Sequence, residues 1–256
     1  LLGCEVQLFC PRADQAFFQH AALNHLGLPV TWFDGFEDPE LTQALDAFDP
    51  DCLLSVIFNH RIPEVIVNRA RLGSLNVHPA PLPGCRTASP WFWPVRMGLG
   101  ESEICIHHIT PALDEGPVLL RHHLELDPHE THGTYAAKVN TAAPLLMKRL
   151  HELLMAPPLP AGEPQTGGHY YPPVQESDLY IDFSQTMAEI DALVRACNPY
   201  HSARALFRGR ELWIHETTCI PGETGDPGIL TVDAENLLVN CGNGRLRLDV
   251  VNRPGE

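Results

Sequence analysis

The sequence predicts an α/β protein with an open, mostly parallel sheet, followed by a smaller domain of short β-strands. In the first half of the chain, strand-like apolar runs alternate with segments of helical periodicity, the order expected of a parallel sheet with helical crossovers. The run 52–58 is apolar at nearly every position, as in a strand covered on both faces of such a sheet. Beyond residue 200, short strand-like runs recur at roughly ten-residue spacing, with Gly and Pro between them.

Local patterns predict the elements of the first domain in chain order. Strands are expected over residues 5–10, 29–33, 52–58, 75–78 and 104–109. Helices are expected over residues 13–26, 39–48, 63–71 and 132–154, with Pro39 in the first turn of the second. Together these elements predict a Rossmann-like sheet, and the absence of a G-x-G-x-x-G sequence argues against a dinucleotide site.

The second half of the chain predicts a linker and a separate domain. Residues 156–174 are rich in Pro and Gly and are expected to form a semi-extended linker between a domain over 1–155 and one over 175–256. The last domain is expected to hold a helix over 186–197 and strands over 180–183, 203–207, 211–215, 228–232, 237–240 and 246–250. Its strand spacing favours a small, OB-like β-barrel. Because the chain begins at Leu1 and soon enters a strand, a further β-α unit outside these residues is left open.

Composition narrows the class of protein. The 17 Lys and Arg against 32 Asp and Glu give a formal net charge of −15, which disfavours nucleic acid as a partner because binding to phosphates needs cationic patches. No apolar run approaches the 18 or so residues of a membrane span, and no segment resembles a signal peptide. We therefore expect a globular protein with no membrane partner.

The cysteines and paired histidines give no sign of a metal site. None of the eight cysteines forms a C-x-x-C pair, and most lie in apolar surroundings, which favours buried free thiols in the reducing cytoplasm over disulfides or zinc. His107-His108 and His122-His123 lie in strand-like runs, where neighbouring side chains face opposite sides. Each pair is therefore interpreted as strand histidines with one member exposed, and no metal is expected.

One stretch brings together polar groups suited to chemistry. Asn76 and His78 share one face of a predicted strand, roughly 6.5–7 Å apart, and a Pro- and Gly-rich loop follows them. Asp114 follows the next predicted strand, on a turn that Gly116 is expected to ease. An amide, an imidazole and a carboxylate at strand ends are groups used in acyl transfer, although each alone is also a capping Asn, a core His or a turn Asp.

The joint pattern resembles a known family. Its pieces are Asn76-Val77-His78, Pro81-Leu82-Pro83, Arg86 and Leu113-Asp114-Glu115-Gly116-Pro117. This pattern is similar to that of the formyltransferases that use 10-formyltetrahydrofolate. Residues 190–199, 212–214, 227–228 and 242–244 resemble the smaller C-terminal domain found in the tRNA and amino-sugar members, so the resemblance covers nearly all of the chain.

The resemblance implies roles for three sets of residues. Asn76, His78 and Asp114 would be catalytic: the amide holds the oxyanion, the imidazole assists it and moves the proton of the amine, and the carboxylate orients the imidazole. The folate would lie between two backbone-lined walls, one containing Phe58, Arg61, Ile62 and Pro63 and the other Ile109, Thr110, Ala112 and Leu113. The acceptor side would include Pro81, Leu82, Arg86 and Glu115, the last replacing a Thr or Ala common in the family.

The resemblance also implies a reaction, with the acceptor left open. We expect transfer of a formyl group from 10-formyltetrahydrofolate, without a metal, to the primary amine of a small molecule such as an amino-sugar nucleotide or an amino acid derivative. Two alternatives remain: methionyl-tRNA formyltransferase, which the acidic balance and the scarcity of Lys disfavour, and an inactive folate-binding module. A homodimer that uses the C-terminal barrel as its interface is left open.

Overall fold

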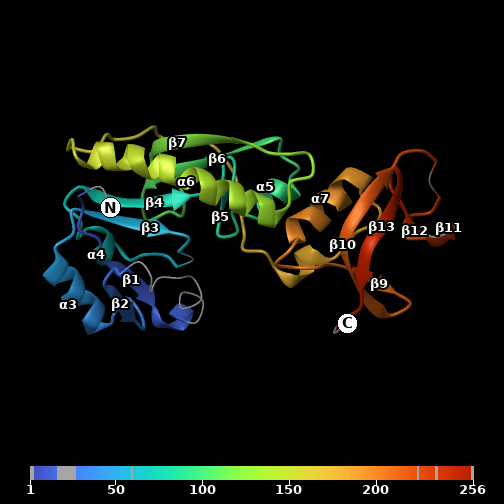
Figure 1. Ribbon diagram of the computed structural model, residues 1–256, viewed down its shortest axis with the longest axis horizontal. Helices are drawn as coiled ribbons and strands as arrows, with labels where there is room; N and C mark the ends of the chain where they lie inside the picture. The colour runs from blue at the N-terminus through green and yellow to red at the C-terminus, as the bar shows by residue number, and fades with distance from the viewer. Residues whose placement is uncertain (1–2, 16–26, 59, 224, 234–235, 255–256) are drawn as a thin grey trace. The chain divides into compact units, whose positions relative to one another are not determined.

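The computed structural model describes residues 3–15, 27–58, 60–223, 225–233 and 236–254 (Figure 1). Its strands are β1 (Leu8–Pro11), β2 (Val30–Phe33), β3 (Cys52–Val56), β4 (Gly73–His78), β5 (Arg86–Thr87), β6 (Glu101–His108), β7 (Val118–Glu125), β8 (Tyr170–Tyr171), β9 (Ala203–Phe207), β10 (Arg210–Ile220), β11 (Leu230–Asp233), β12 (Asn236–Cys241) and β13 (Gly244–Asn252). Its helices are η1 (Arg12–Asp14), α3 (Pro39–Phe48), α4 (Glu64–Val67), α5 (Trp93–Arg96), α6 (His132–Leu154), η2 (Glu176–Leu179) and α7 (Met187–Cys197).

The N-terminal strands form the expected α/β arrangement in part. β1 pairs with β2 and β3 with β4, both in parallel, and the larger sheet has the order β3-β4-β6-β7. Beside these parallel pairs, β6 and β7 form a hairpin, closed by the backbone N–H of His108 donating to the carbonyl oxygen of Pro117 (3.0 Å). A parallel crossover needs a dozen or more residues, and the connection 109–117 is too short for one.

The predicted burial of β3 on both faces is wrong. Leu54 and Val56 are exposed, and among the described residues β3 stands at the end of the sheet order, with a strand on one side only. The helix expected over 13–26 falls largely on residues 16–26, which lie outside the described residues.

Helix α3 occupies the predicted residues because both of its ends are specified locally. Asp38 caps it by accepting a hydrogen bond from the backbone of Glu40 (2.9 Å), Pro39 fills the first helical position, and Asp49 ends it in a left-handed conformation. The apolar face of α3 joins a core cluster of Phe33, Leu41, Leu45 and Ile66. Helix α4 is shorter than predicted, because the backbones of Arg71 and Leu72 donate to Pro50 and Asp51 before the next strand begins.

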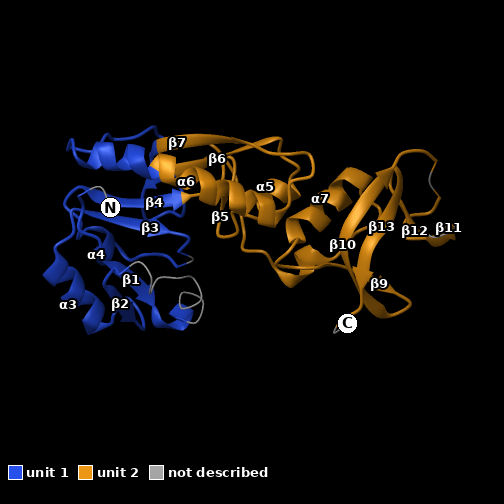
Figure 2. Ribbon diagram, in the orientation of Figure 1, with its two compact units in different colours: residues 1–77, 106–119, 147–164 blue, residues 78–105, 120–146, 165–256 orange. Residues whose placement is uncertain are grey.

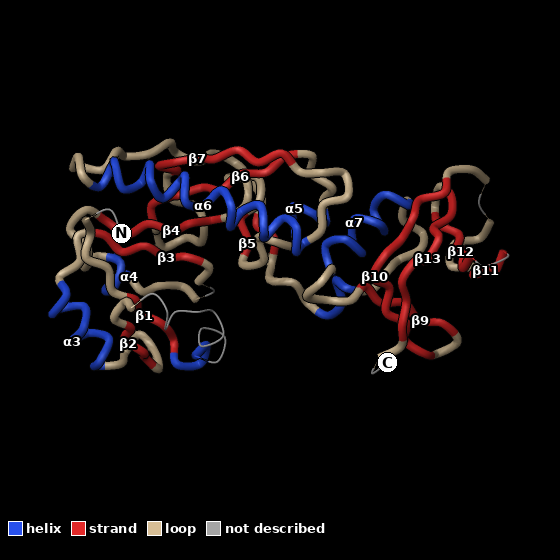
Figure 3. The backbone as a smooth tube through the Cα atoms, in the orientation of Figure 1, coloured by secondary structure: helices blue, strands red, loops and turns tan. Residues whose placement is uncertain are grey.

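The C-terminal strands form an open sheet instead of the predicted OB-like barrel. They are antiparallel in the order β11-β12-β13-β10-β9, with α7 beside them (Figure 3). β10 pairs with β9 over its first half and with β13 over most of its length, with irregular register between Ile214 and Thr217. Among the described residues, the edge strands β11 and β9 do not pair, so the sheet does not close. The strand expected over 180–183 is reduced to an isolated bridge between Tyr180 and Arg204.

The chain divides into two compact units (Figure 2). The first contains residues 1–77, 106–119 and 147–164, and the second contains residues 78–105, 120–146 and 165–256. The chain therefore passes from one unit to the other within α6, which runs from His132 to Leu154.

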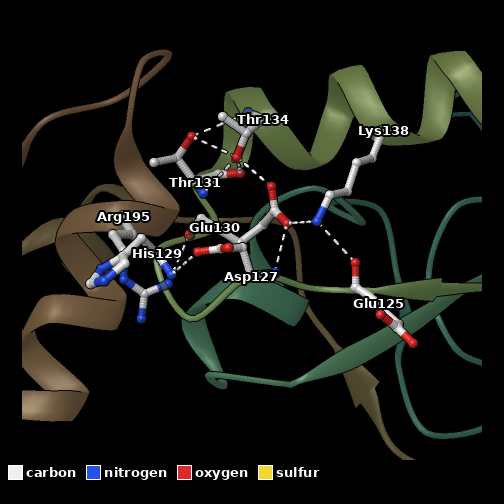
Figure 4. Close-up of polar contacts among 8 residues, drawn as sticks. All are labelled: Glu125, Asp127, His129, Glu130, Thr131, Thr134, Lys138 and Arg195. Atoms are coloured by element: carbon white, nitrogen blue, oxygen red, sulfur yellow. Dashed lines mark hydrogen bonds and ion pairs between the residues drawn. The ribbon is translucent and has the colours of Figure 1, made fainter.

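Within the second unit, polar contacts join the start of α6 to α7 (Figure 4). The buried carboxylate of Glu130 accepts hydrogen bonds from Lys138, Thr134 and the backbone of Asp127. Burial raises the pKa of Glu130, but these hydrogen bonds outweigh it and hold the pKa below its usual value. Arg195 of α7 donates to the Glu130 carbonyl (2.7 Å), so the turn before α6 and the helix α7 are held together.

Candidate active site

Two neighbouring segments supply the polar side chains that the sequence singled out. β4 carries Asn76 and ends on His78, and the hairpin between β6 and β7 carries Asp114. Asn76 and Asp114 lie in the first compact unit together with His107, whereas His78 begins the second unit. Asn76, His107 and Asp114 form one group of contacts within the first unit, and His78 makes a hydrogen bond within the second.

The first group joins an amide, an imidazole and a carboxylate. Nδ2 of Asn76 lies 3.1 Å from Nε2 of His107 and donates to Oδ1 of Asp114 at 3.4 Å. Nε2 of His107 is also 3.5 Å from Oδ1 of Asp114, and these two side chains are 3% and 4% exposed. The three groups therefore meet in a largely dry environment, where hydrogen bonds are stronger than in water.

Hydrogen bonding determines the tautomer of His107. Its Nδ1 lies 2.9 Å from the carbonyl oxygen of His108, to which only an N–H can donate. Nδ1 therefore carries the proton, and Nε2 accepts one amide hydrogen of Asn76. The other amide hydrogen of Asn76 is directed to Asp114.

The backbone conformation of the turn explains why Asp114 and Gly116 occupy their positions. Asp114 itself has a positive φ of 54°, a conformation that short polar residues tolerate better than most. Gly116 was expected to ease this turn by its own flexibility, but its role is different. A Cβ at position 116 would lie 1.7 Å from the carbonyl oxygen of His108, so the strand end approaches too closely for any side chain.

His78, in the second unit, is buried and makes a hydrogen bond of its own. Its Nε2 lies 2.9 Å from the carbonyl oxygen of Cys85, and the His78 residue is 3% exposed. The turn that brings this carbonyl into place is closed by the bond from Cys85 N to Pro81 O (2.7 Å). Since the carbonyl accepts, Nε2 of His78 carries a proton and donates it there.

The residues predicted to line a folate slot occupy two loops of the first unit. Phe58 and Ile62 are half-buried against the core cluster beside β3, Arg61 is exposed, and Pro63 precedes α4. In the hairpin loop, Ile109 donates its backbone N–H to Ser74 (2.8 Å), and Thr110 donates its hydroxyl to the carbonyl of Ala112 (3.0 Å). Leu113 is 46% exposed, beside the buried Asp114.

The residues predicted on the acceptor side differ in their surroundings. Leu82 is buried, and its carbonyl accepts from Arg121 (2.7 Å); Pro81 is half-buried. Arg86 lies in β5 and donates to the side chain of Gln165 at 3.4 Å. Glu115 is exposed.

Sequence reasoning missed His107 as a member of the group. Strand alternation predicted that one histidine of the pair 107–108 is buried but did not say which one. A usable signal is position: His107 stands at the end of β6, seven residues before Asp114, at the start of the loop that carries the carboxylate. A polar residue at a strand end beside such a loop is a candidate for the same site.

The thiols of the described residues are largely buried. All eight cysteines are free, and five of them are buried, as the sequence predicted for most. Burial raises the pKa of the Cys105 thiol to about 12, so this sulfur stays protonated at neutral pH. Within the part of the chain that the structure describes, no group of three metal-ligating side chains gathers, and no helix is long and apolar enough to span a bilayer.

Two family descriptions match this chain. The family described as "Formyl transferase" matches residues 20–150, and "Formyl transferase, C-terminal domain" matches residues 173–256. The methionyl-tRNA formyltransferase of Dechloromonas aromatica (strain RCB) is 32% identical over 238 residues, covering 91% of this chain and 75% of the relative.

Solved structures share the fold at low identity. HypX from Aquifex aeolicus, in complex with tetrahydrofolic acid, matches 97% of this chain with a TM-score of 0.67 and 16% identity; the match spans 44% of HypX. WlaRD, a sugar 3N-formyl transferase in the presence of dTDP and 5-N-formyl-THF, matches 99% of this chain and 100% of its own length, with a TM-score of 0.63 and 14% identity.

Proposed function

Because the chain belongs to the formyltransferase family, we propose that it transfers a formyl group from 10-formyltetrahydrofolate to a primary amine. The observation that carries the proposal is the meeting of Asn76, His107 and Asp114, at a position where the family pattern already called for Asn76 and Asp114. An amide donor is suited to hold the negative charge that develops on a formyl oxygen.

In this proposal three residues share the chemistry. Asn76 donates an N–H to the formyl oxygen while the acceptor nitrogen attacks the formyl carbon. His78 takes the proton that the amine loses, and the bond from the formyl carbon to N10 of the folate breaks as N10 gains a proton. Asp114 is proposed to orient His78 and to stabilise, through its charge, the positive charge that the imidazole gains with this proton. His107 orients the Asn76 amide.

The folate is proposed to lie between two loops of the first unit. One wall is formed by Phe58, Arg61, Ile62 and Pro63, and the other by Ile109, Thr110, Ala112 and Leu113. Support comes from the tetrahydrofolic acid of HypX and the 5-N-formyl-THF of WlaRD, both in proteins of this fold. A pterin ring suits a flat apolar slot whose peptide groups can read its polar edge. The proposed reaction needs no metal.

For the acceptor, we propose the primary amine of a small molecule, such as an amino-sugar nucleotide or an amino acid derivative. The net charge of −15 supports this choice, as does the similarity in fold to a sugar 3N-formyl transferase. The acceptor side is proposed to include Pro81, Leu82, Arg86 and Glu115.

A second candidate is methionyl-tRNA. The relative from Dechloromonas aromatica is named a methionyl-tRNA formyltransferase, and its 32% identity extends over 91% of this chain. This observation weakens the expectation that nucleic acid is not a partner. The two acceptors differ in charge, and the salt dependence of the reaction separates them.

The reaction is tested by release of tetrahydrofolate. The protein is mixed with 10-formyltetrahydrofolate and a panel of amino sugars, amino acids and methionyl-tRNA, and the spectral change on deformylation is recorded together with the mass of the product. We expect one class of acceptor to gain a formyl group, and the variants Asn76→Ala, His78→Ala and Asp114→Ala to be slower. Folate binding without formylation of any acceptor would instead support an inactive folate-binding module.

The domain organisation and the cellular compartment are also part of the proposal. We propose a catalytic domain over 1–155, a linker over 156–174 and a C-terminal domain over 175–256, supported by the interval between the two family matches. The eight free cysteines support a reducing compartment such as the cytoplasm.

A further inference from the structure

The end of the proposed linker is built into the second compact unit. Tyr170 and Tyr171 form β8, which pairs in parallel with β5, so that Tyr170 stands opposite Arg86. Just before β8, the backbone N–H of Arg86 donates to the carbonyl of His169 (3.1 Å), and the backbone N–H of His169 donates to the carbonyl of Pro83 (3.3 Å). The segment thus adds a short strand to the loop that follows β4.

Side chains reinforce this attachment along its length. The guanidinium of Arg86 donates to Oε1 of Gln165 (3.4 Å) at one end. At the other end, Nε1 of Trp93 donates to the carbonyl of Pro172 (2.9 Å), and the Trp93 ring lies 5.0 Å from that of Tyr171. These contacts extend from residue 165 to residue 172.

Gly168 marks the closest approach of the segment to the loop. Its φ is +92°, and a Cβ added there would lie 2.1 Å from the carbonyl oxygen of Pro83 and 2.7 Å from the Pro83 Cβ. These are backbone and ring atoms, which cannot rotate away, so a side chain at 168 would displace Pro83. The preceding Gly167 also has a positive φ, +68°, but a Cβ there would meet nothing within 4 Å.

Displacement of Pro83 would also move the carbonyl group to which His78 donates a hydrogen bond. Pro83 and Cys85 belong to the same tight turn, closed by the bond from Cys85 N to Pro81 O (2.7 Å). The carbonyl of Cys85 is the acceptor for Nε2 of His78 at 2.9 Å, and both residues are buried. A shift of this turn therefore moves the group that fixes the imidazole.

We propose that residues 165–172, with Gly168 at their centre, are a positioning element for the histidine at the end of β4. By holding Pro83 and Arg86 in place, they hold the Cys85 carbonyl, which keeps the proton of His78 on Nε2. The consequence for catalysis rests on the proposed formyl transfer; the orientation of the imidazole does not.

The test compares Gly168→Ala with Gly167→Ala. Both place alanine at a positive φ, which carries a conformational cost, but only the first collides with the loop. Nitrogen-15 spectra of labelled histidine, with the His78 signals assigned by a His78→Gln variant, report the tautomer. We expect the wild type and Gly167→Ala to show the Nε2–H tautomer of His78, and Gly168→Ala to show a mixture.

Turnover provides the second readout. We expect kcat of Gly168→Ala to fall about 10–100-fold with KM for the formyl donor little changed, because a displaced catalytic group loses transition-state rather than ground-state interactions. Gly167→Ala keeps the wild-type kcat.

Where Gly168→Ala does not fold, a second variant tests the same inference. Trp93→Phe removes the hydrogen bond to Pro172 and keeps an aromatic ring, and it is expected to show a smaller change of the same kind.

Two results would overturn the inference: an unchanged His78 tautomer in a folded Gly168→Ala protein, or equal effects of the two alanines. A wild-type protein that formylates no amine would contradict the proposed function. In that case the tautomer measurement, which needs no turnover, still decides whether the segment positions His78.

Discussion

At the scale of a residue, Asn76 is committed to protein acceptors before any substrate is present. Its Nδ2 has two hydrogens, one directed to His107 and the other to Asp114. A formyl oxygen must replace one of these acceptors to be held by the amide. The contact with Asp114 (3.4 Å) is longer than that with His107 (3.1 Å), so the carboxylate is the partner expected to give way.

The first prediction follows from that exchange. Asn76→Ala is expected to lower kcat by about 10²–10³, as loss of an oxyanion donor does in other enzymes, with little change in KM for the formyl donor. Steady-state kinetics with tetrahydrofolate release as the signal measures both. Asn140→Ala, at an exposed position in α6, is the matched control. An effect confined to KM would show that the amide binds the ground state instead.

The second prediction separates charge from backbone at Asp114. Asn tolerates the positive φ of 54° found there, whereas Ala in that conformation costs about 1 kcal/mol. Asp114→Asn is therefore expected to keep the wild-type melting temperature and lose about 10²-fold in kcat/KM, since it removes only the charge. Asp114→Ala is expected to lose the activity and about 1 kcal/mol of stability. Retention of activity in Asp114→Asn would contradict a role for the carboxylate charge.

The spacing of residues along the strands made part of the candidate site predictable. The even spacing of Asn76 and His78 predicted a shared face, and the loop after the next strand supplied Asp114. His107 escaped because alternation assigns opposite faces to His107 and His108 without fixing which one turns inward. That choice depends on the packing of β6 against its neighbours, which no local pattern contains.

At the scale of an element, local sequence predicts where a helix ends unless hydrogen bonds to distant residues set the end. The bounds of α3 were predictable because its cap, its first-turn proline and its left-handed end are all written in the sequence. The end of α4 was not, because it is set by hydrogen bonds to Pro50 and Asp51. Strand spacing predicted β9 to β13 but could not predict closure, which depends on whether the two edge strands meet.

The third prediction concerns pH and the start of α6. The pKa of His132 is lowered to about 4, first by burial, while its hydrogen bond to Ala196 and the nearby His201 act in opposite directions. The unfolded chain, with an ordinary pKa near 6.5, binds the proton at pH 5 and the folded protein does not. Stability is therefore complete above about pH 6.5 and declines as the pH falls, by about 2 kcal/mol at pH 5 from this group.

Urea unfolding at pH 7.5 and pH 5 measures this contribution. His132→Phe keeps a ring against Tyr200, which lies 4.7 Å away, and removes the titrating group. We expect the wild type to lose about 2 kcal/mol more than the variant between the two pH values. Equal losses would mean that His132 is protonated in the folded protein as readily as in the unfolded chain.

At the scale of the whole molecule, composition indicates which segments lack regular structure, but not which other segments they contact. The Pro- and Gly-rich stretch was predicted to be a linker, yet its end pairs with β5 and belongs to the second compact unit. Proline and glycine indicate where regular structure stops, but not which surface the extended chain then follows.

The balance of charge is also a property of the whole molecule. Of the 17 Lys and Arg, at least eight are already paired with carboxylates, namely Arg12, Arg69, Arg71, Arg121, Lys138, Arg195, Arg204 and Arg247. A cation that is paired with a carboxylate must lose that partner before it can neutralise a phosphate. This pairing is an argument for the proposed small-molecule acceptor over methionyl-tRNA.

The fourth prediction uses salt to identify the acceptor class. A protein that neutralises six to ten phosphates loses about 10³–10⁵ in affinity between 50 and 200 mM salt, whereas a small amine releases few counterions. We expect kcat/KM for the acceptor to change by less than about threefold over this range, measured with the amine that the panel identifies. Uncharged osmolyte at matched osmolality is the control. A steep, log-linear loss of activity with methionyl-tRNA as the formylated acceptor would contradict the small-molecule proposal, because counterion release of that size requires a phosphate backbone along the binding surface.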